Sequence, residues 1–100
     1  MEYTFNKTKF IVGRNAKENW DIVSRADKNY YWLHLNDIAS AHVIIEIDVE
    51  PTQEELNYAL ELCKSQTFKN KEIKNVTYIC TQVKNLKLGS KVGEVIVKIK

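Results

Sequence analysis

Apolar and polar residues alternate along several short stretches of the chain, which is the pattern of half-buried β-strands. Residues 3–12 alternate on both sides of Asn6, a residue suited to a tight turn. They therefore predict a β-hairpin that ends at Gly13. Four further strands are predicted, at residues 30–35, 42–49, 75–83 and 94–100.

Two segments have the spacing of helices instead. The first begins at Asn15, a favourable N-cap, with Glu18 three residues later to complete a capping box. The second begins at Thr52, with Glu55 as its capping-box partner. The helices are expected to end near Arg25 and near residues 65–66. The apolar stripe of the second helix consists of Leu56, Ala59, Leu60 and Cys63.

The elements follow one another in the order ββαββαββ. This order predicts a single compact α+β domain over residues 1–100, with a mostly antiparallel sheet and two helices. Residues 68–74 are predicted to be a lysine-rich connection, and residues 84–92 a second basic loop. A chain of 100 residues is near the low end of what one hydrophobic core can stabilise.

The third and fourth strands also predict their own register. If they pair symmetrically about Ile38, Leu33 faces Val43, and the apolar side chains share one face. A one-residue slip would mix apolar and polar residues on both faces. The same register puts His34 directly across from His42. The face that these imidazoles share also carries Tyr30, Trp32, Ile44 and Glu46.

Charge is spread unevenly along the chain. There are 15 Lys and Arg residues against 13 Asp and Glu residues, which gives a formal net charge of +2. Residues 1–63 hold 6 basic and 11 acidic residues, whereas residues 64–100 hold 9 basic and 2 acidic residues. The basic third is a candidate surface for a polyanion, unless folding interleaves it with the acidic part.

The distribution of apolar residues also bears on where in the cell the protein is expected. No apolar run approaches the roughly 20 residues of a membrane helix. The N-terminus lacks the basic start and apolar stretch of a signal peptide. We therefore expect a cytoplasmic protein, or a nuclear one, with no membrane partner. Cys63 and Cys80 have the spacing of neither a zinc site nor a disulfide scaffold, so two buried, reduced thiols are expected.

His34 and His42 are the first candidates for chemistry. Such a pair could supply a catalytic base, or zinc ligands if a third ligand lay on the same side. No His-x-x-x-His or Cys-x-x-Cys spacing supports zinc. Two other interpretations stay open: the imidazoles contact a phosphate or a base, or they are half-buried and bonded to the backbone or to Ser40. We expect no metal, no cofactor and no catalytic residue.

Basic residues are the second set of candidates. Gly13-Arg14-Asn15 precedes a helix N-terminus, whose free N–H groups suit a phosphate, and Arg14 adds a guanidinium fork. The alternative is a strand-to-helix turn with a solvated arginine. The lysines predicted in loops suit a nucleic-acid backbone, or else form a solubilising surface; they are Lys64, Lys69, Lys71, Lys74, Lys84, Lys87 and Lys91.

Short motifs in a fixed order resemble those of one family, NFACT-R. They are Gly13-Arg14-Asn15-Ala16 with Asn19, Trp32-Leu33-His34, Ser40-Ala41-His42-Val43, Ser65, and Val92-Gly93-Glu94-Val95. This family is the predicted RNA-binding domain at the end of ribosome-quality-control factors that recruit tRNA to stalled large subunits, and it also occurs as a free-standing domain. Ser40-Ala41-His42-Val43 and Asn85-Leu86-Lys87 look most similar to the free-standing coiled-coil-domain-containing 25 proteins.

The resemblance covers about residues 8–97 and implies a nucleic-acid-binding module without catalytic chemistry of its own. The family's polar positions fall on Gly13, Arg14, Asn15, Asn19, His34, Ser40 and His42. The chain departs from the family at Tyr30, where an aspartate is usual, and at Trp20, where an acidic residue is common.

We therefore expect a non-enzymatic domain that binds structured RNA, either tRNA or rRNA, in translation or ribosome quality control. DNA is a second candidate ligand. A protein-interaction module that docks on the ribosome, or on a ribosome-associated or acidic protein, is the alternative; it requires Trp32 and Tyr30 to be exposed as an anchor. A hydrolase that uses the His pair is the third hypothesis. The predicted nucleic-acid-binding residues are Arg14, Asn15, Asn19, Trp32, His34, Ser40, His42, Lys69, Lys71, Lys84, Lys87 and Lys91.

Overall fold

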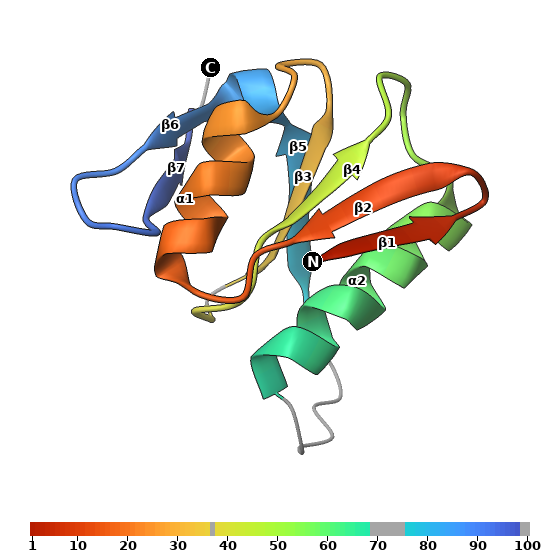
Figure 1. Cartoon of the computed structure of the whole chain (residues 1–100), viewed down its shortest axis with the longest axis horizontal. Helices are drawn as coiled ribbons and strands as arrows, with labels where there is room; N and C mark the ends of the chain where they lie inside the picture. Colours follow the sequence, from red (N-terminus) through yellow and green to blue (C-terminus); the bar gives the residue numbers. More distant parts are fainter. Residues whose placement is uncertain (37, 69–75, 99–100) are drawn as a thin grey trace.

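The strands and helices follow the predicted order with one additional strand. The computed structural model describes residues 1–36, 38–68 and 76–98. Its elements are β1 (Glu2–Phe5), β2 (Thr8–Val12), α1 (Ala16–Arg25), β3 (Tyr31–Leu35), β4 (Val43–Glu46), α2 (Gln53–Phe68), β5 (Tyr78–Gln82), the 3₁₀ turn η1 (Val83–Asn85), β6 (Leu86–Leu88) and β7 (Val95–Val97). The predicted α+β class, with two helices and antiparallel strands, is confirmed (Figure 1).

Five of these strands form one antiparallel sheet with the order β1-β2-β4-β3-β5. The predicted register of its central pair is confirmed, because Leu33 lies opposite Val43. The predicted hairpin is present as β1 and β2. Its turn residues Asn6 and Lys7 have φ values of 50° and 62°, as a two-residue turn of the primed type requires. The local pattern of the chain is therefore sufficient to set these strand pairs.

Helix α2 covers one face of the sheet. Its buried residues Ala59 and Cys63 pack against a cluster from β2, β3 and β4 that includes Phe10, Leu33 and Ile45. The predicted capping box is present: the Thr52 hydroxyl accepts from the Glu55 N–H at 3.1 Å, and the Glu55 carboxylate accepts from the Thr52 N–H at 2.9 Å. That backbone bond lowers the pKa of Glu55.

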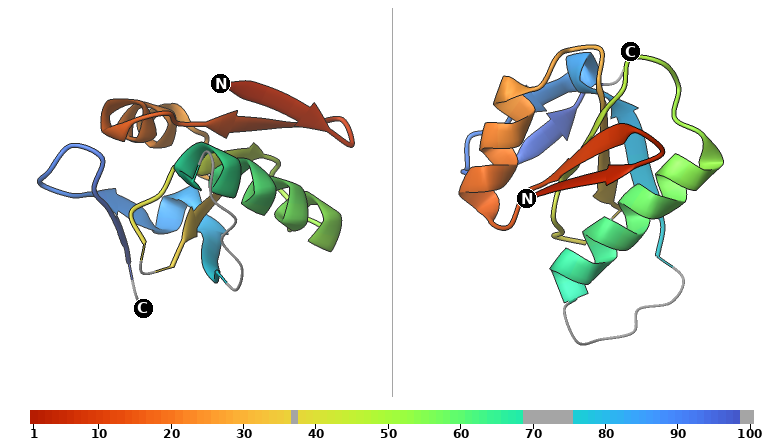
Figure 2. Two further views of the ribbon diagram at one scale, coloured as in Figure 1. Left: turned by 90° about the horizontal axis from the view of Figure 1, so that it is seen from below. Right: turned by 45° about the vertical axis from the view of Figure 1, so that its right-hand side comes forward.

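Helix α1 and the β6–β7 pair cover the other face (Figures 1 and 2). Trp32 and Ile44 point to this side and pack with Val23 of α1, Val83 of η1 and Leu86 of β6. The expectation that this face presents its aromatic residues to a partner is therefore wrong. The face is a second core, and its edge near the imidazoles stays open.

The segment 84–92 differs from the predicted basic loop. Leu86–Leu88 forms β6, which pairs antiparallel with β7. Leu86 is buried against the second core, while Lys87 and Leu88 are exposed. The apolar-polar-apolar pattern of residues 86–88 is the sequence signal for this strand. The lysines around it led to the prediction of a basic loop instead. The predicted last strand is likewise shorter, ending at Val97 within the described residues.

The two cysteines are both free. Cys63 on α2 is fully buried, as predicted, and its thiol donates to the Ala41 carbonyl at 3.1 Å. Cys80 in β5 is only half-buried. Burial raises the pKa of both thiols, that of Cys80 to about 11, so both are protonated at neutral pH.

Candidate functional site

A cavity of about 410 Å³ opens where five segments of the chain meet. These segments are the N-terminus of α1, β3, residues 39–42 before β4, the last turn of α2, and the residues before β7. The cavity brings together six of the predicted binding residues: Arg14, Asn15, Asn19, His34, Ser40 and His42. Its volume lies in the lower part of the range of protein sites that bind small molecules.

Both imidazoles line the cavity, where His42 is buried at 3% exposed and His34 is half-buried. The ring centroids of His34 and His42 are 4.6 Å apart with the planes at 83°, so the predicted pair is in contact. His34 also stacks on Trp32, with centroids 5.5 Å apart and planes at 6°. Trp32, which is buried in the second core, thus supports one face of the His34 ring.

One hydrogen bond fixes the state of His42. The Trp32 indole N–H donates to Nδ1 of His42 at 3.1 Å. Since an indole nitrogen can only donate, Nδ1 must accept, and the proton of the neutral ring is on Nε2. Burial, and secondarily the neighbouring His34, lowers the pKa of His42 to about 3. Burial also lowers the pKa of His34. Both rings are therefore neutral at neutral pH and add no positive charge to the site.

Asn19 joins α1 to the segment before β4. Its Oδ1 accepts from the backbone N–H of His42 at 3.2 Å, and the His42 carbonyl accepts from the Gly13 N–H at 3.0 Å. A Cβ atom at Gly13 would lie only 2.0 Å from Oδ1 of Asn19. Glycine is therefore required here by the close approach of the Asn19 side chain, which explains why Gly13 belongs to the site motif.

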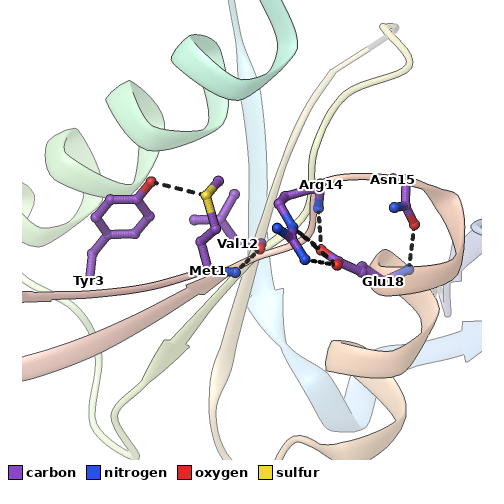
Figure 3. Close-up of polar contacts among 6 residues, drawn as sticks. All are labelled: Met1, Tyr3, Val12, Arg14, Asn15 and Glu18. Carbon is purple, nitrogen blue, oxygen red and sulfur yellow. Dashed lines mark hydrogen bonds and ion pairs between the residues drawn. The ribbon is translucent and has the colours of Figure 1, made fainter.

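Arg14 lies at the rim and is already paired. Its guanidinium bonds to the Glu18 carboxylate at 2.5 Å, and its backbone N–H donates to the same carboxylate at 2.9 Å (Figure 3). Asn15 caps α1 as predicted by accepting from the Glu18 N–H, but Glu18 reaches back to Arg14 rather than to Asn15. The pair with Arg14 lowers the pKa of Glu18 to about 2. The Arg14 guanidinium, which was predicted to bind phosphate, thus has its charge partly neutralised by Glu18.

Ser40 and Thr67 also line the cavity. The Ser40 hydroxyl accepts from the Leu35 N–H at 3.1 Å and donates to the Ala41 carbonyl at 3.0 Å. The Thr67 hydroxyl accepts from the Ala41 N–H at 3.0 Å and donates to the Cys63 carbonyl at 2.7 Å. Both hydroxyls are fully engaged with the backbone, so they shape the wall more than they offer free groups to a ligand.

The structure separates the predicted lysines. Lys91 is exposed and directly precedes Val92, which lines the cavity. Lys87 is exposed on β6. The Lys84 N–H instead bonds the Lys28 carbonyl beyond the C-terminus of α1. A ten-residue helix is about 15 Å long, so Lys84 lies at the end of α1 remote from the cavity. Lys69 and Lys71 lie outside the described residues.

Trp32 requires a correction. It is only 2% exposed, so its indole is not available to a nucleic acid or to a protein partner as predicted. The protein-docking hypothesis loses its anchor for the same reason. Burial follows from the packing of Trp32 under α1 and β6, which the alternation of β3 alone does not show. Its contribution to the site is to orient His34 and His42.

The described part of the chain holds neither a candidate metal site nor a candidate membrane-spanning helix. Among residues 1–36, 38–68 and 76–98, no group of three or more His, Cys, Asp or Glu is arranged to hold a metal ion. Within the same ranges, no helix combines the length and the apolar character needed to cross a bilayer.

Comparison with known proteins gives the family. The sequence matches the family described as NFACT protein RNA binding domain over residues 2–98, which includes every described strand and helix. The chain belongs to this family. The match confirms the resemblance seen in the site motifs; the particular similarity to the free-standing group stays a prediction.

Two relatives place this NFACT RNA-binding domain among longer proteins. It is 35% identical over 60 residues to the Rqc2 homolog RqcH of Streptococcus suis, a match that covers 59% of this chain and 11% of that protein. It also superposes on the solved C-terminal part of the fibronectin/fibrinogen-binding protein FBPS of Streptococcus suis. The TM-score is 0.85 at 27% identity, covering 97% of this chain and 41% of the other. The chain thus spans about a tenth of the length of RqcH and about two fifths of the solved FBPS chain.

Some residues of the NFACT domain's cavity were missed by sequence reasoning. Gln66 and Thr67 line it from the last turn of α2, beyond or at the predicted helix end. Gly93 lines it with φ of 88°, and a Cβ there would lie 2.7 Å from Cβ of Ala16. Gly93 was part of the Val92-Gly93-Glu94-Val95 motif but was not assigned to the site; its place before a strand was a further signal, because this backbone conformation favours glycine. No comparable signal marked Gln66.

Proposed function

We propose that this domain binds RNA without catalysing a reaction, and that the cavity with its neighbouring cations is the binding surface. The observation that carries the proposal is the convergence of Arg14, Asn19 and the His34–His42 pair on one cavity from separate segments. Each of these signals is weak in the sequence, and folding collects them at one place. Membership of a family described as RNA-binding supports the same conclusion.

The finer proposal is that the ligand is structured RNA, tRNA or rRNA, in translation or ribosome quality control. It follows from the resemblance to the domain of ribosome-quality-control factors, and the similarity to RqcH supports it. We further propose that Arg14, Lys87 and Lys91 contact phosphates, while Asn15, Asn19 and His34 contact bases or riboses.

A catalytic role is disfavoured by what the candidate groups already do. Nδ1 of His42 is engaged by the Trp32 indole, and the only described thiol near the cavity, that of Cys63, is buried and protonated. The hydroxyls of Ser40 and Thr67 donate to backbone carbonyls. No described nucleophile is therefore paired with a free base, as covalent catalysis requires.

Salt dependence of RNA affinity tests the proposal. Fluorescence anisotropy with labelled tRNA, single-stranded RNA and duplex DNA at several salt concentrations gives the slope of log K against log salt. About five phosphate contacts predict a slope near −3.5 to −4.5. Lys91→Gln should make the slope shallower by about one phosphate contact, whereas His34→Ala should weaken binding with little change in slope.

Lys7→Asn is the matched control. Lys7 is an exposed lysine in the β1–β2 turn, and asparagine tolerates its positive φ, so this variant removes a charge without straining the fold. It should leave affinity and slope nearly unchanged. Absence of RNA binding at low salt, or binding that does not depend on salt, would contradict the proposed function. Tighter binding to duplex DNA than to tRNA would contradict the finer proposal.

A further inference from the structure

The described residues that line the cavity carry almost no net charge. Arg14 is the only one with a permanent charge, and it is paired with Glu18 at the rim. His34 and His42 are neutral because burial lowers their pKa. A phosphate inside this cavity would lose its hydration without gaining a free cation, which is costly. The interior therefore suits a neutral, polar and planar group, and the phosphates belong outside it.

Three neighbouring bonds decide which side-chain atoms of the cavity residues remain as donors. The Trp32 N–H makes Nδ1 of His42 the acceptor and so leaves Nε2–H as a donor. The His42 backbone N–H makes Oδ1 of Asn19 the acceptor and so leaves its Nδ2 as a donor. The Glu18 N–H fixes Asn15 in the same way. Because each partner is an N–H group, none of these side chains can flip without losing its bond.

Asn19 is the most informative of the three. It is only 8% exposed, yet within the described residues its Nδ2 makes no hydrogen bond. No side-chain nitrogen or oxygen of the described residues is both sealed from solvent and without a partner, so this unpaired Nδ2 is accessible and can be reached by an acceptor. The position of Asn19 on the cavity wall indicates that the acceptor comes from the ligand.

An aromatic surface lies beside these donors. His34 is half-buried, lines the cavity and is held parallel to Trp32 beneath it. Such a supported ring is a suitable platform for an unstacked base, as in other proteins that bind single-stranded RNA segments.

We propose that the cavity receives a single unstacked nucleobase and binds a carbonyl-bearing edge of it, as uracil presents, through the donors of Asn19, Asn15 and His42. The inference rests on the proposed RNA-binding function and names the part of the RNA that enters the site. Adenine fits this donor set less well, because it has no carbonyl and carries an exocyclic amino group, itself a donor.

The test compares RNA hairpins that differ at one position. The first has a continuous duplex, and the others carry one bulged uridine, one bulged adenosine or one bulged abasic residue at the same place. We expect the uridine bulge to bind about tenfold more tightly than the abasic bulge. The adenosine bulge should bind more weakly than the uridine bulge, and the continuous duplex should match the abasic one.

Asn19→Asp tests the donor itself. Aspartate keeps the acceptor for the His42 N–H but replaces Nδ2 with an oxygen, so the uridine-to-abasic ratio should fall to about two or less. Asn57→Asp is the matched control, since Asn57 is an exposed residue of α2 that contacts Gln53. It adds the same charge and should leave the ratio unchanged.

The outcomes separate this inference from the proposed function. Equal affinity for uridine and abasic bulges, with salt-dependent binding to both, would overturn the base-binding inference and leave RNA binding intact. Equal affinity for uridine and adenosine, both above abasic, would overturn the preference for a carbonyl edge. No binding to any hairpin at low salt would overturn the proposed function itself.

Discussion

At the scale of single residues, the site is built by side chains that fix one another. Trp32 sets the tautomer of His42, and the His42 backbone sets the orientation of Asn19. Gly13 leaves the space that Asn19 occupies. A residue that never touches the ligand, such as Trp32, can thus be as necessary to the site as one that does.

Burial of His42 predicts a dependence of stability on pH. Its pKa is lowered to about 3 in the folded protein, whereas an unfolded histidine titrates near 6.5. The unfolded chain therefore gains the proton first as the pH falls. The stabilisation is complete above the unfolded pKa and is lost progressively from pH 6.5 toward pH 3. His42 should lower the free energy of unfolding by about 2 kcal/mol between pH 7 and pH 5.

Urea denaturation at pH 7, 6 and 5 measures this loss. His42→Gln is the comparison, because a glutamine oxygen can still accept from the Trp32 indole while the side chain no longer titrates. The variant should lose less stability across this range than the wild-type protein. Parallel pH profiles for the two proteins would contradict the assignment, whatever their absolute stabilities.

At the scale of elements, the N-terminus of α1 has two roles: its residues stabilise the helix, and they also line the cavity. Asn15 caps the helix, Glu18 forms an ion pair with Arg14, and the cavity opens beside this first turn. Glu18 favours the helix, since an acidic residue complements the positive end of the helix dipole, but it opposes the approach of a polyanion. The Glu18 carboxylate therefore stabilises helix α1 and weakens the binding of a polyanion.

Glu18→Gln should increase RNA affinity several-fold and make the salt dependence steeper by about one phosphate contact, because it frees the Arg14 guanidinium. The cost to stability should be small, since the ion pair is exposed and Asn15 still caps the helix. Anisotropy titrations at two salt concentrations measure the effect. Glu54→Gln, in the first turn of α2, is the control with the same change of charge. Weaker binding in Glu18→Gln would show that Arg14 does not contact phosphate.

Prediction from sequence also succeeded at the scale of elements where the signal was local. The β1–β2 turn, both N-caps and the register of β3 with β4 depend on residues close in the chain, and all are confirmed. Strand β6 was missed because it is short and lies among lysines, and it is held mainly by its pairing with β7. The burial of Trp32 was missed for the same physical reason, as its cover comes from α1 and β6.

At the scale of the whole molecule, two cores on opposite faces of one sheet leave a cavity at their shared edge. The six predicted residues that line it come from segments up to 28 residues apart, from Arg14 to His42, and the last turn of α2 and Gly93 complete it. The sequence predicted those six residues. It did not predict that Gln66 and Gly93 complete the cavity, because long-range packing brings these two residues to it. The basic third of the chain is only partly gathered there, since Lys84 lies at the far end of α1.

Mapping of backbone amide shifts by NMR tests this picture most directly. Titration of the ¹⁵N-labelled protein with tRNA should shift the amides of Gly13, Asn15, His42 and Gly93, and should leave those of the β1–β2 turn at residues 5–8 in place. Shifts that are largest at the β1–β2 turn, or that spare the cavity while RNA binds, would contradict the account.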